Sequence, residues 1–308
     1  MKHYINFAIV LLLFSSKGFS QNFTAKEIAV NTLIEGTLLV PNAVEQPALA
    51  IIIAGSGPVD RNGNQNFARN NSLKKLAEGL TNNGIATFRY DKRTIKLIAT
   101  GKLDNTIMFD DFVTDAIDVV NYFKSQNTYS KIYIIGHSQG SLIGMIAAEK
   151  DVDGFISIAG ASQTIDKIII KQVEQTAPAY LEDTKKIFSV LQEGKTTSNY
   201  PPVLSSFLGK DIQPFMINWM QYNPQDILKS LQIPILIVNG TNDLQVGVED
   251  ANRLKDSNPS AELKLIDKMN HVLFSIEGDD LVNFKSYNES HHKVTPELID
   301  TISGFIKK

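Results

Sequence analysis

The amino-acid sequence predicts an α/β protein with a mostly parallel central sheet, helices on both faces and a helical insertion. Short apolar runs rich in β-branched residues recur along the chain and alternate with segments of helical periodicity. This alternation is typical of parallel strands joined by right-handed helical crossovers. It is interrupted once, over residues 162–232, and then resumes.

The composition fits one large globular core and excludes several classes of site. The chain has 308 residues, of which 43% are hydrophobic and 20% charged, and its net charge is −3. This balance gives no electrostatic reason to expect nucleic acid or an anionic membrane surface as a partner. There is no cysteine, so disulfides, thiolate catalysis and cysteine-based metal centres are excluded.

Residues 1–20 predict a secretory signal peptide. Lys2 is followed by an apolar run over residues 7–14 and by a small, polar stretch that ends at Ser20. The apolar run is too short to span a bilayer. We therefore expect cleavage after Ser20 and a mature chain that is secreted or periplasmic, without a stable membrane anchor. A buried N-terminal core helix is the alternative.

The first predicted elements are a hairpin, a buried strand and a helix. The hairpin covers residues 27–40 and ends at Pro41, and residues 48–54 form an apolar run typical of a strand buried on both faces. A polar, glycine-rich loop over residues 55–64 leads to a helix over 72–80. Asn82-Asn83-Gly84 follows as a helix stop.

Alternating strands and helices continue to residue 161. We predict strands over 85–90, 132–135 and 154–159, and helices over 109–123 and 142–148. Four aspartates fall on the first of these helices: Asp110, Asp111, Asp115 and Asp118. We interpret them as helix-start charges and a solvated face, and not as a metal site.

The second half of the chain divides into an insertion and the remaining core. Residues 162–232 are mostly helical by period, which predicts a lid across one edge of the sheet. A strand over 233–239, a helix over 250–256, a strand over 261–266 and a helix over 296–306 follow. The predicted organisation is therefore a core over 21–161, a lid over 162–232 and a second core segment over 233–308.

A strand, a Gly-x-Ser-x-Gly pentapeptide and a helix follow one another directly. The pentapeptide is Gly136-His137-Ser138-Gln139-Gly140. This order is what a nucleophile elbow requires: a tight turn that strains the serine backbone and pushes its hydroxyl out of the sheet. Both glycines are needed because a Cβ there would strike the neighbouring helix or strand. Ser138 is the predicted nucleophile; an ordinary serine in a glycine-rich turn is the alternative.

A serine nucleophile needs a base, usually a histidine oriented by a carboxylate. His137 is inside the elbow and points away from the Ser138 side chain, and His291 and His292 lie in a polar run. His271 follows the last predicted strand, at the sheet edge where a base belongs. We predict His271 as the base.

Asp243 is the predicted orienting carboxylate. It follows the strand over 233–239 in a turn that favours an exposed short acid. An Asx-turn role is the alternative for Asp243, and Asp267 is the rival acid, though it lies close in sequence to His271. The order Ser138, Asp243, His271 matches that of known serine hydrolases.

With these motifs, the chain resembles the α/β-hydrolase superfamily across its whole mature length. The matching segments are the elbow, Gly240-Thr241-Asn242-Asp243-Leu244-Gln245-Val246 and Met269-Asn270-His271-Val272-Leu273. Residues 55–63, 89–93, 286–288 and 295–298 are similar to an exported bacterial branch described as serine-aminopeptidase-like or dienelactone-hydrolase-like. Thr94-Ile95-Lys96 departs from that branch, which has a glycine-containing turn there.

The resemblance implies an α/β-hydrolase fold and an oxyanion hole. One donor is the backbone N–H after the nucleophile, here that of Gln139. The other comes from the loop after the third strand, where Ser56 is expected and Gly57 is the alternative. No metal and no cofactor are expected.

The expected activity is that of a secreted serine hydrolase acting on a carboxylic ester through an acyl-enzyme. The expected partner is therefore a small-molecule ester or a short peptide-like substrate. An aminopeptidase or other amide hydrolase, and then a thioester hydrolase, are alternatives within the enzyme class. A non-catalytic ligand-binding protein of the same fold is the alternative of another class.

The sequence leaves two interpretations open for each of two further groups of residues. Asp60, Arg61, Arg89, Asp91 and Arg93 form either a structural ion-pair network or a grip on a substrate carboxylate. Within the insertion, five large side chains at helical spacing form either core or the wall of an acyl pocket. They are Phe215, Met216, Trp219, Met220 and Tyr222.

Overall fold

The computed structural model describes residues 22–66 and 68–308. The predicted signal peptide, residues 1–20, lies outside the described residues. Within the described ranges, every helix is too short or too polar to cross a bilayer.

In the described residues, eight strands form one sheet in the order β1-β2-β4-β3-β5-β6-β7-β8. β1, β2 and β4 pair antiparallel, whereas all pairs from β4 to β8 are parallel. The strands are β1 (Phe23–Ala29), β2 (Glu35–Pro41), β3 (Leu49–Ile53), β4 (Ala86–Tyr90), β5 (Ile132–His137), β6 (Gly154–Ile158), β7 (Ile235–Gly240) and β8 (Glu262–Ile266). The predicted fold class, including its opening hairpin, is confirmed.

Both faces of the central strands are buried, which explains their continuous apolar runs. In β3, Leu49, Ile51 and Ile53 join one core while Ala50 and Ile52 join the other. Since successive side chains of a strand point to opposite faces, the sheet separates two hydrophobic layers.

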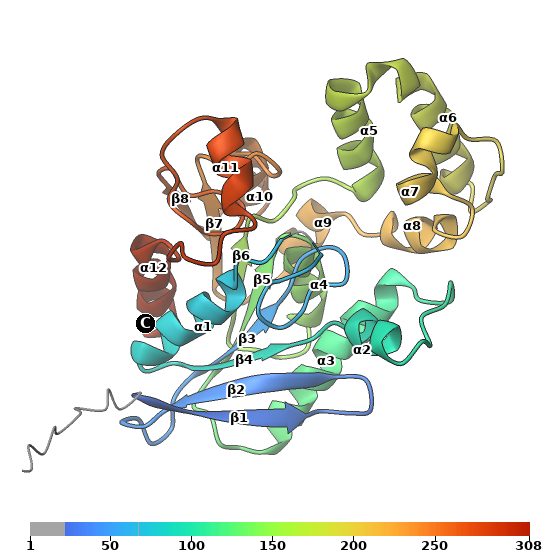
Figure 1. Ribbon diagram of the computed structural model, residues 1–308. Coiled ribbons are helices and arrows are strands. Elements are labelled where there is room, and N and C mark those ends of the chain that lie inside the picture. The colour runs from blue at the N-terminus through green and yellow to red at the C-terminus, as the bar shows by residue number, and fades with distance from the viewer. Residues whose placement is uncertain (1–21, 67) are drawn as a thin grey trace, which may run out of the picture.

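Helices cover both faces of the sheet (Figure 1). One layer consists of α3 (Phe109–Ser125), α4 (Gln139–Ala147), α9 (Pro224–Ser230) and α10 (Val248–Ser257), whose apolar side chains share one core. The other layer contains α1 (Ser72–Asn82) and α12 (Pro296–Ile306). α12 has the bounds that the sequence predicted.

The lid helices gather at one end of the molecule, apart from the sheet (Figure 1). They are α5 (Ile165–Thr176), η1 (Pro178–Tyr180), α6 (Leu181–Gln192), η2 (Pro202–Leu204), α7 (Ser205–Leu208) and α8 (Gln213–Trp219). They have a hydrophobic core of their own, which includes Ile169, Phe188 and Met216. α9 belongs elsewhere: Leu228 and Leu231 are buried in the main core. The predicted lid boundary at residue 232 is therefore too late, because α9 packs against α4 and α10.

Two helices have no counterpart in the sequence prediction. α2 (Arg93–Ala99) follows β4, and α11 (Asp280–Ser286) lies between β8 and α12. Both are only seven residues long, so their apolar periodicity is too brief to be recognised.

The interpretation of the α3 aspartates as a solvated face is wrong for Asp115. This residue is buried, with 2% of its surface exposed, and its carboxylate pairs with Arg93 at 2.7 Å. Asp111 also pairs with Arg93, and its carboxylate accepts a hydrogen bond from the Met108 N–H. Helical spacing could not reveal this, because the cation comes from the unpredicted helix α2.

Candidate active site

Ser138 lies on a strained turn between β5 and α4. Its φ is 55° and its ψ is −122°, a combination that non-glycine residues rarely adopt and that costs about 1–3 kcal/mol. The two glycines of the pentapeptide make the turn possible. A Cβ on Gly136 would lie 2.2 Å from the Gly140 carbonyl oxygen, and one on Gly140 would lie 2.4 Å from that of Ile53.

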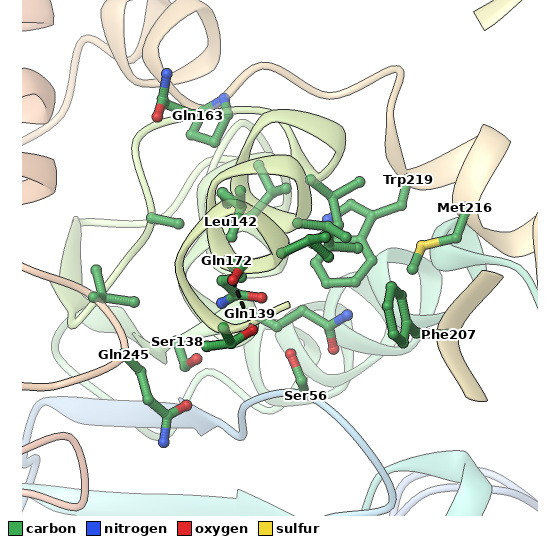
Figure 2. A pocket seen from close by; sticks show the side chains of 18 residues that line it. Ser56, Ser138, Gln139, Leu142, Gln163, Gln172, Phe207, Met216, Trp219 and Gln245 are labelled. Atoms are coloured by element: carbon green, nitrogen blue, oxygen red, sulfur yellow. Dashed lines mark hydrogen bonds between the residues drawn. The ribbon is translucent and has the colours of Figure 1, made fainter. Parts of the chain in front are cut away.

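The Ser138 side chain opens on two cavities. The larger, about 500 Å³, lies between α4 and the lid, and the smaller, about 150 Å³, extends toward His271. Figure 2 shows Ser138 and Gln139 facing the larger cavity, with Met216 and Trp219 on its far side. Within the described residues, Ser138 Oγ forms no hydrogen bond. Catalytic hydrogen bonds of unliganded enzymes are often long and shorten only when substrate binds.

His271 and Asp243 form a buried pair at the edge of the smaller cavity. His271 Nδ1 lies 2.8 Å from Asp243 Oδ2, and 7% and 0% of the two side chains are exposed. A carboxylate only accepts, so Nδ1 carries the proton and Nε2 of the neutral ring is left as an acceptor. Asp267, the rival acid, is exposed and accepts a hydrogen bond from Thr241 instead.

The surroundings of Asp243 keep its carboxyl ionised. Burial raises its pKa, but attraction to His271, the hydrogen bond from His271 and the backbone N–H groups of Val246 and Gln245 outweigh burial. Those amides lie 2.9 Å and 2.8 Å from Oδ1. The net pKa of Asp243 is below its ordinary value, so the carboxylate is charged at neutral pH.

His137 joins the elbow to the His271 loop. Its Nε2–H donates to the His271 carbonyl oxygen at 2.8 Å. Burial and repulsion by His271 lower the pKa of His137 to about 4, so the ring is neutral at physiological pH. The Nε2 of His137 therefore holds the backbone of His271 in place.

A buried polar network that the sequence did not reveal also supports this loop. Asn270 Oδ1 accepts the Phe274 N–H, and its Nδ2 donates to Asn283 Oδ1 and Ser286 Oγ. Asn283 Nδ2 in turn donates to the Asn242 carbonyl oxygen, beside Asp243. The network links α11 to the loops of both triad candidates. The only sequence signal was the polar Asn270 beside His271, because its partners lie on the unpredicted helix.

Two backbone N–H groups are available beside Ser138. Ser56 follows β3 and lines both cavities with Ser138, and within the described residues its N–H donates no hydrogen bond. Gln139 is the first residue of α4, and the first N–H of a helix has no acceptor within that helix. Both N–H groups are therefore free to stabilise negative charge.

The charged loops form structural ion pairs. Arg61 pairs with Asp91 and with Glu27, and Arg93 pairs with Asp111 and Asp115. Arg89 donates from Nε to Asn62 Oδ1 at 3.3 Å. Among the described residues, no arginine lines either cavity at Ser138. These contacts support the interpretation as a structural ion-pair network. They do not support the alternative in which an arginine binds a substrate carboxylate.

The large side chains of the insertion serve both as core and as a cavity wall, the two roles that their spacing left open. Trp219 stacks on Phe109 of α3 with ring centroids 5.3 Å apart, and Phe215 contacts Phe109 and Phe112 edge-on. Trp219 and Met216 also line the larger cavity. The same helix thus anchors the lid on α3 and walls the cavity.

Among the described residues, one group of side chains outside this site could hold a metal ion. Ligand atoms of Glu289, His291 and His292 lie within 4.8 Å of one another. His292 Nε2 is already 2.8 Å from Glu289 Oε2, and none of the three lines a cavity at Ser138.

Comparisons with known proteins agree with this fold. A family model described as serine aminopeptidase, S33, matches residues 69–211. Esterase EstD of Thermotoga maritima is 27% identical over 295 residues, covering 94% of this chain and 68% of that protein. Among solved structures, Est1E of Butyrivibrio proteoclasticus has a TM-score of 0.58 at 20% identity, covering 92% of this chain and 99% of that one. A dienelactone hydrolase of Anabaena variabilis has a TM-score of 0.52 at 14% identity, covering 92% and 96%.

The eight-stranded sheet, the serine elbow and these matches define an α/β-hydrolase. The protein is a serine hydrolase of the α/β-hydrolase type, and it is similar to esterases.

Proposed function

We propose that this protein cleaves a carboxylic ester through an acyl-enzyme formed on Ser138. His271 Nε2 takes the Ser138 proton as Oγ bonds to the substrate carbonyl carbon, and the N–H groups of Gln139 and Ser56 hold the resulting oxyanion. The bond to the alcohol oxygen then breaks, and His271 returns the proton to that oxygen. Water attacks the acyl-enzyme by the same route, with Asp243 stabilising the imidazolium.

The observation that carries this proposal is the position of the strained serine. Ser138 shares a cavity with His271, whose Nδ1 is held by Asp243 at 2.8 Å. Each of the three side chains follows the carboxyl end of a parallel strand, β5, β7 or β8. Such an arrangement supplies a nucleophile, a base and an orienting carboxylate.

The cavity walls favour an ester over a peptide N-terminus. Among the described residues, neither cavity at Ser138 is lined by an aspartate or glutamate. An aminopeptidase has to bind the substrate's α-ammonium, and a buried ammonium needs a charged or strongly polar partner. The larger cavity presents mostly apolar side chains, including Leu142, Ile169 and Trp219, and its glutamines, such as Gln163 and Gln172, are uncharged.

An apolar acyl group fits this cavity. Its volume of about 500 Å³ is in the range of small-molecule sites. The solved neighbour Est1E has been captured with ferulic acid bound, and EstD carries the description esterase. These relatives support an ester with a medium-sized or aromatic acyl group as the substrate class.

Labelling with a fluorophosphonate tests the nucleophile. We expect the wild type to be labelled and to hydrolyse nitrophenyl esters, and Ser138→Ala to lose both properties. Ser141→Ala, which removes a hydroxyl bonded to Ser157, is the control and should keep the label. A folded wild type that stays unlabelled would point to a ligand-binding protein.

A substrate comparison tests the bond. Turnover of nitrophenyl esters should exceed that of aminoacyl anilides by at least about 100-fold, a difference of roughly 3 kcal/mol in transition-state stabilisation. A preference for anilides would contradict the ester proposal. A preference for thioesters would also contradict it and would indicate a thioester hydrolase.

We further propose that the protein is exported after removal of residues 1–20. The motif of a short basic start, an apolar run and a small-residue end supports this. N-terminal sequencing of the protein purified from its native host should begin at Gln21. A start at Met1 would contradict export by this route.

A further inference from the structure

Lys92 is a buried cation beside the two predicted oxyanion donors. It lies at the carboxyl end of β4 with 4% of its surface exposed. Its Nζ donates to the Gly55 carbonyl oxygen at 3.0 Å and to Gln139 Oε1 at 2.8 Å. It also lies over the Phe112 ring, 4.2 Å from the centroid. Among the described residues, no carboxylate forms an ion pair with it.

The contact with Gly55 acts on the peptide unit that supplies the Ser56 N–H. In a trans peptide the C=O and N–H bonds point in opposite directions. Fixing the Gly55 oxygen against Lys92 therefore fixes the Ser56 N–H on the other side of the same plane. That N–H donates no hydrogen bond within the described residues, and Ser56 lines both cavities on which Ser138 opens.

The contact with Gln139 acts on the second donor. Gln139 is 8% exposed, and its side-chain oxygen is held by the ammonium. Its backbone N–H is the first of α4. One ammonium group thus links the β3 loop to the start of α4, two segments 84 residues apart in the sequence, counting from Gly55 to Gln139.

Three acceptor groups surround the Lys92 ammonium, and they distinguish a positioning role from direct binding of a substrate. Its Nζ donates to two carbonyl oxygens and lies over an aromatic face, which favours positioning over direct contact with a substrate. Burial lowers the pKa of Lys92 to about 7, against the opposing effect of Asp115. At pH 7 the side chain is therefore about half protonated, and a lysine so strongly perturbed beside a cavity points to a function.

We propose that Lys92 is a positioning residue that holds and polarises the oxyanion hole without touching the substrate. Resting on the proposed function, this inference assigns to Lys92 the orientation of the Ser56 and Gln139 donors. Because a positive charge on the Gly55 oxygen withdraws electrons from the amide, it also makes the Ser56 N–H a stronger donor. The benefit arises only when the oxyanion forms.

Lys92→Met tests this role, since it keeps the unbranched stem on Phe112 and removes the charge. We expect kcat for a nitrophenyl ester to fall about 10- to 100-fold, less than the loss of a whole oxyanion donor, while KM changes by less than about threefold. Affinity for a trifluoromethyl ketone, which forms a tetrahedral adduct with a serine, should fall by the same factor as kcat.

Lys75→Met is a matched control. Lys75 Nζ also donates to backbone carbonyl oxygens, those of Asn70, Ser290 and His292, and lies over the Phe274 ring. It is remote in its contacts from Ser56 and Gln139, so its removal should lower thermal stability but leave kcat and ketone affinity unchanged. If Lys92→Met does not fold, Gln139→Leu removes half of the same link and should reduce kcat and ketone affinity together.

Three outcomes would overturn the inference. Unchanged kcat and ketone affinity in Lys92→Met would remove any role in the oxyanion hole. A rise in KM at constant kcat would assign Lys92 to substrate binding. A fall in kcat with unchanged ketone affinity would indicate a general structural defect. Each of these is distinguishable from failure of the proposed function, which Ser138→Ala tests separately.

Discussion

His137 and His271 are joined through a side chain and a backbone. The Nε2–H of His137, inside the serine elbow, donates to the carbonyl oxygen of His271 at 2.8 Å, and the two ring centroids are 4.9 Å apart. The residue preceding the nucleophile therefore positions the loop of the predicted base. Because the two residues are 134 positions apart in the chain, this hydrogen bond also ties β5 to the segment after β8.

This relationship predicts a specific dependence of stability on pH. The pKa of His137 is lowered to about 4 from 6.5, so between these values the unfolded chain binds a proton that the folded chain does not. Stability should fall as pH decreases from about 6.5 toward 4, by up to ~3 kcal/mol from this group. Urea unfolding of the wild type and of His137→Gln at pH 6.5 and 4.5 measures it. The variant should show the smaller loss, and parallel losses would contradict the assignment.

Asp243→Asn is expected to reduce kcat by about 10³- to 10⁴-fold, because the amide cannot hold the His271 tautomer that leaves Nε2 as a base. Steady-state kinetics with a nitrophenyl ester measure the effect. Asp267→Asn is the matched control, since this acid is exposed and contacts Thr241. Equal effects of the two substitutions would argue against Asp243 as the orienting acid.

Gly140→Ala should destabilise the fold severely. The added Cβ would lie 2.4 Å from the Ile53 carbonyl oxygen and 2.6 Å from that of Ala54, and both belong to backbone at the end of β3. A cost of about 3 kcal/mol or more follows from such overpacking. Gly304→Ala, on α12 with nothing within 4 Å, should instead change stability by less than about 1 kcal/mol, in the stabilising direction. The denaturant concentration at the midpoint of unfolding should fall for Gly140→Ala and rise slightly for Gly304→Ala.

Ile168→Trp should shorten the preferred acyl chain. Ile168 is half-buried on α5 and lines the larger cavity, so a larger side chain reduces the space available to the acyl group. We expect kcat/KM to fall at least about tenfold for octanoyl esters, within the range of pocket discrimination, and to change little for acetyl esters. Lys167→Trp, at an exposed neighbouring position, is the control. An unchanged chain-length profile would show that the acyl group does not occupy this cavity.

Much of this protein can be derived from local sequence patterns. The apolar runs of β3 and β5, the helical period of α12 and the glycines around Ser138 each depend on residues close together in the chain. Their consequences, namely strand, helix and strained turn, are set by backbone sterics and side-chain periodicity. The fold class and the candidates Ser138, Asp243 and His271 followed from these patterns and from strand order.

Tertiary structure alone decided the contacts between distant segments. The burial of Asp115 by Arg93 and the placement of Lys92 against Gly55 and Gln139 both depend on which loops meet at one sheet edge. The packing of α9 with the core and the cavity under α5 and α8 depend on how helices stack. Such contacts follow from strand register and helix packing across the whole chain, which no short window of sequence encodes.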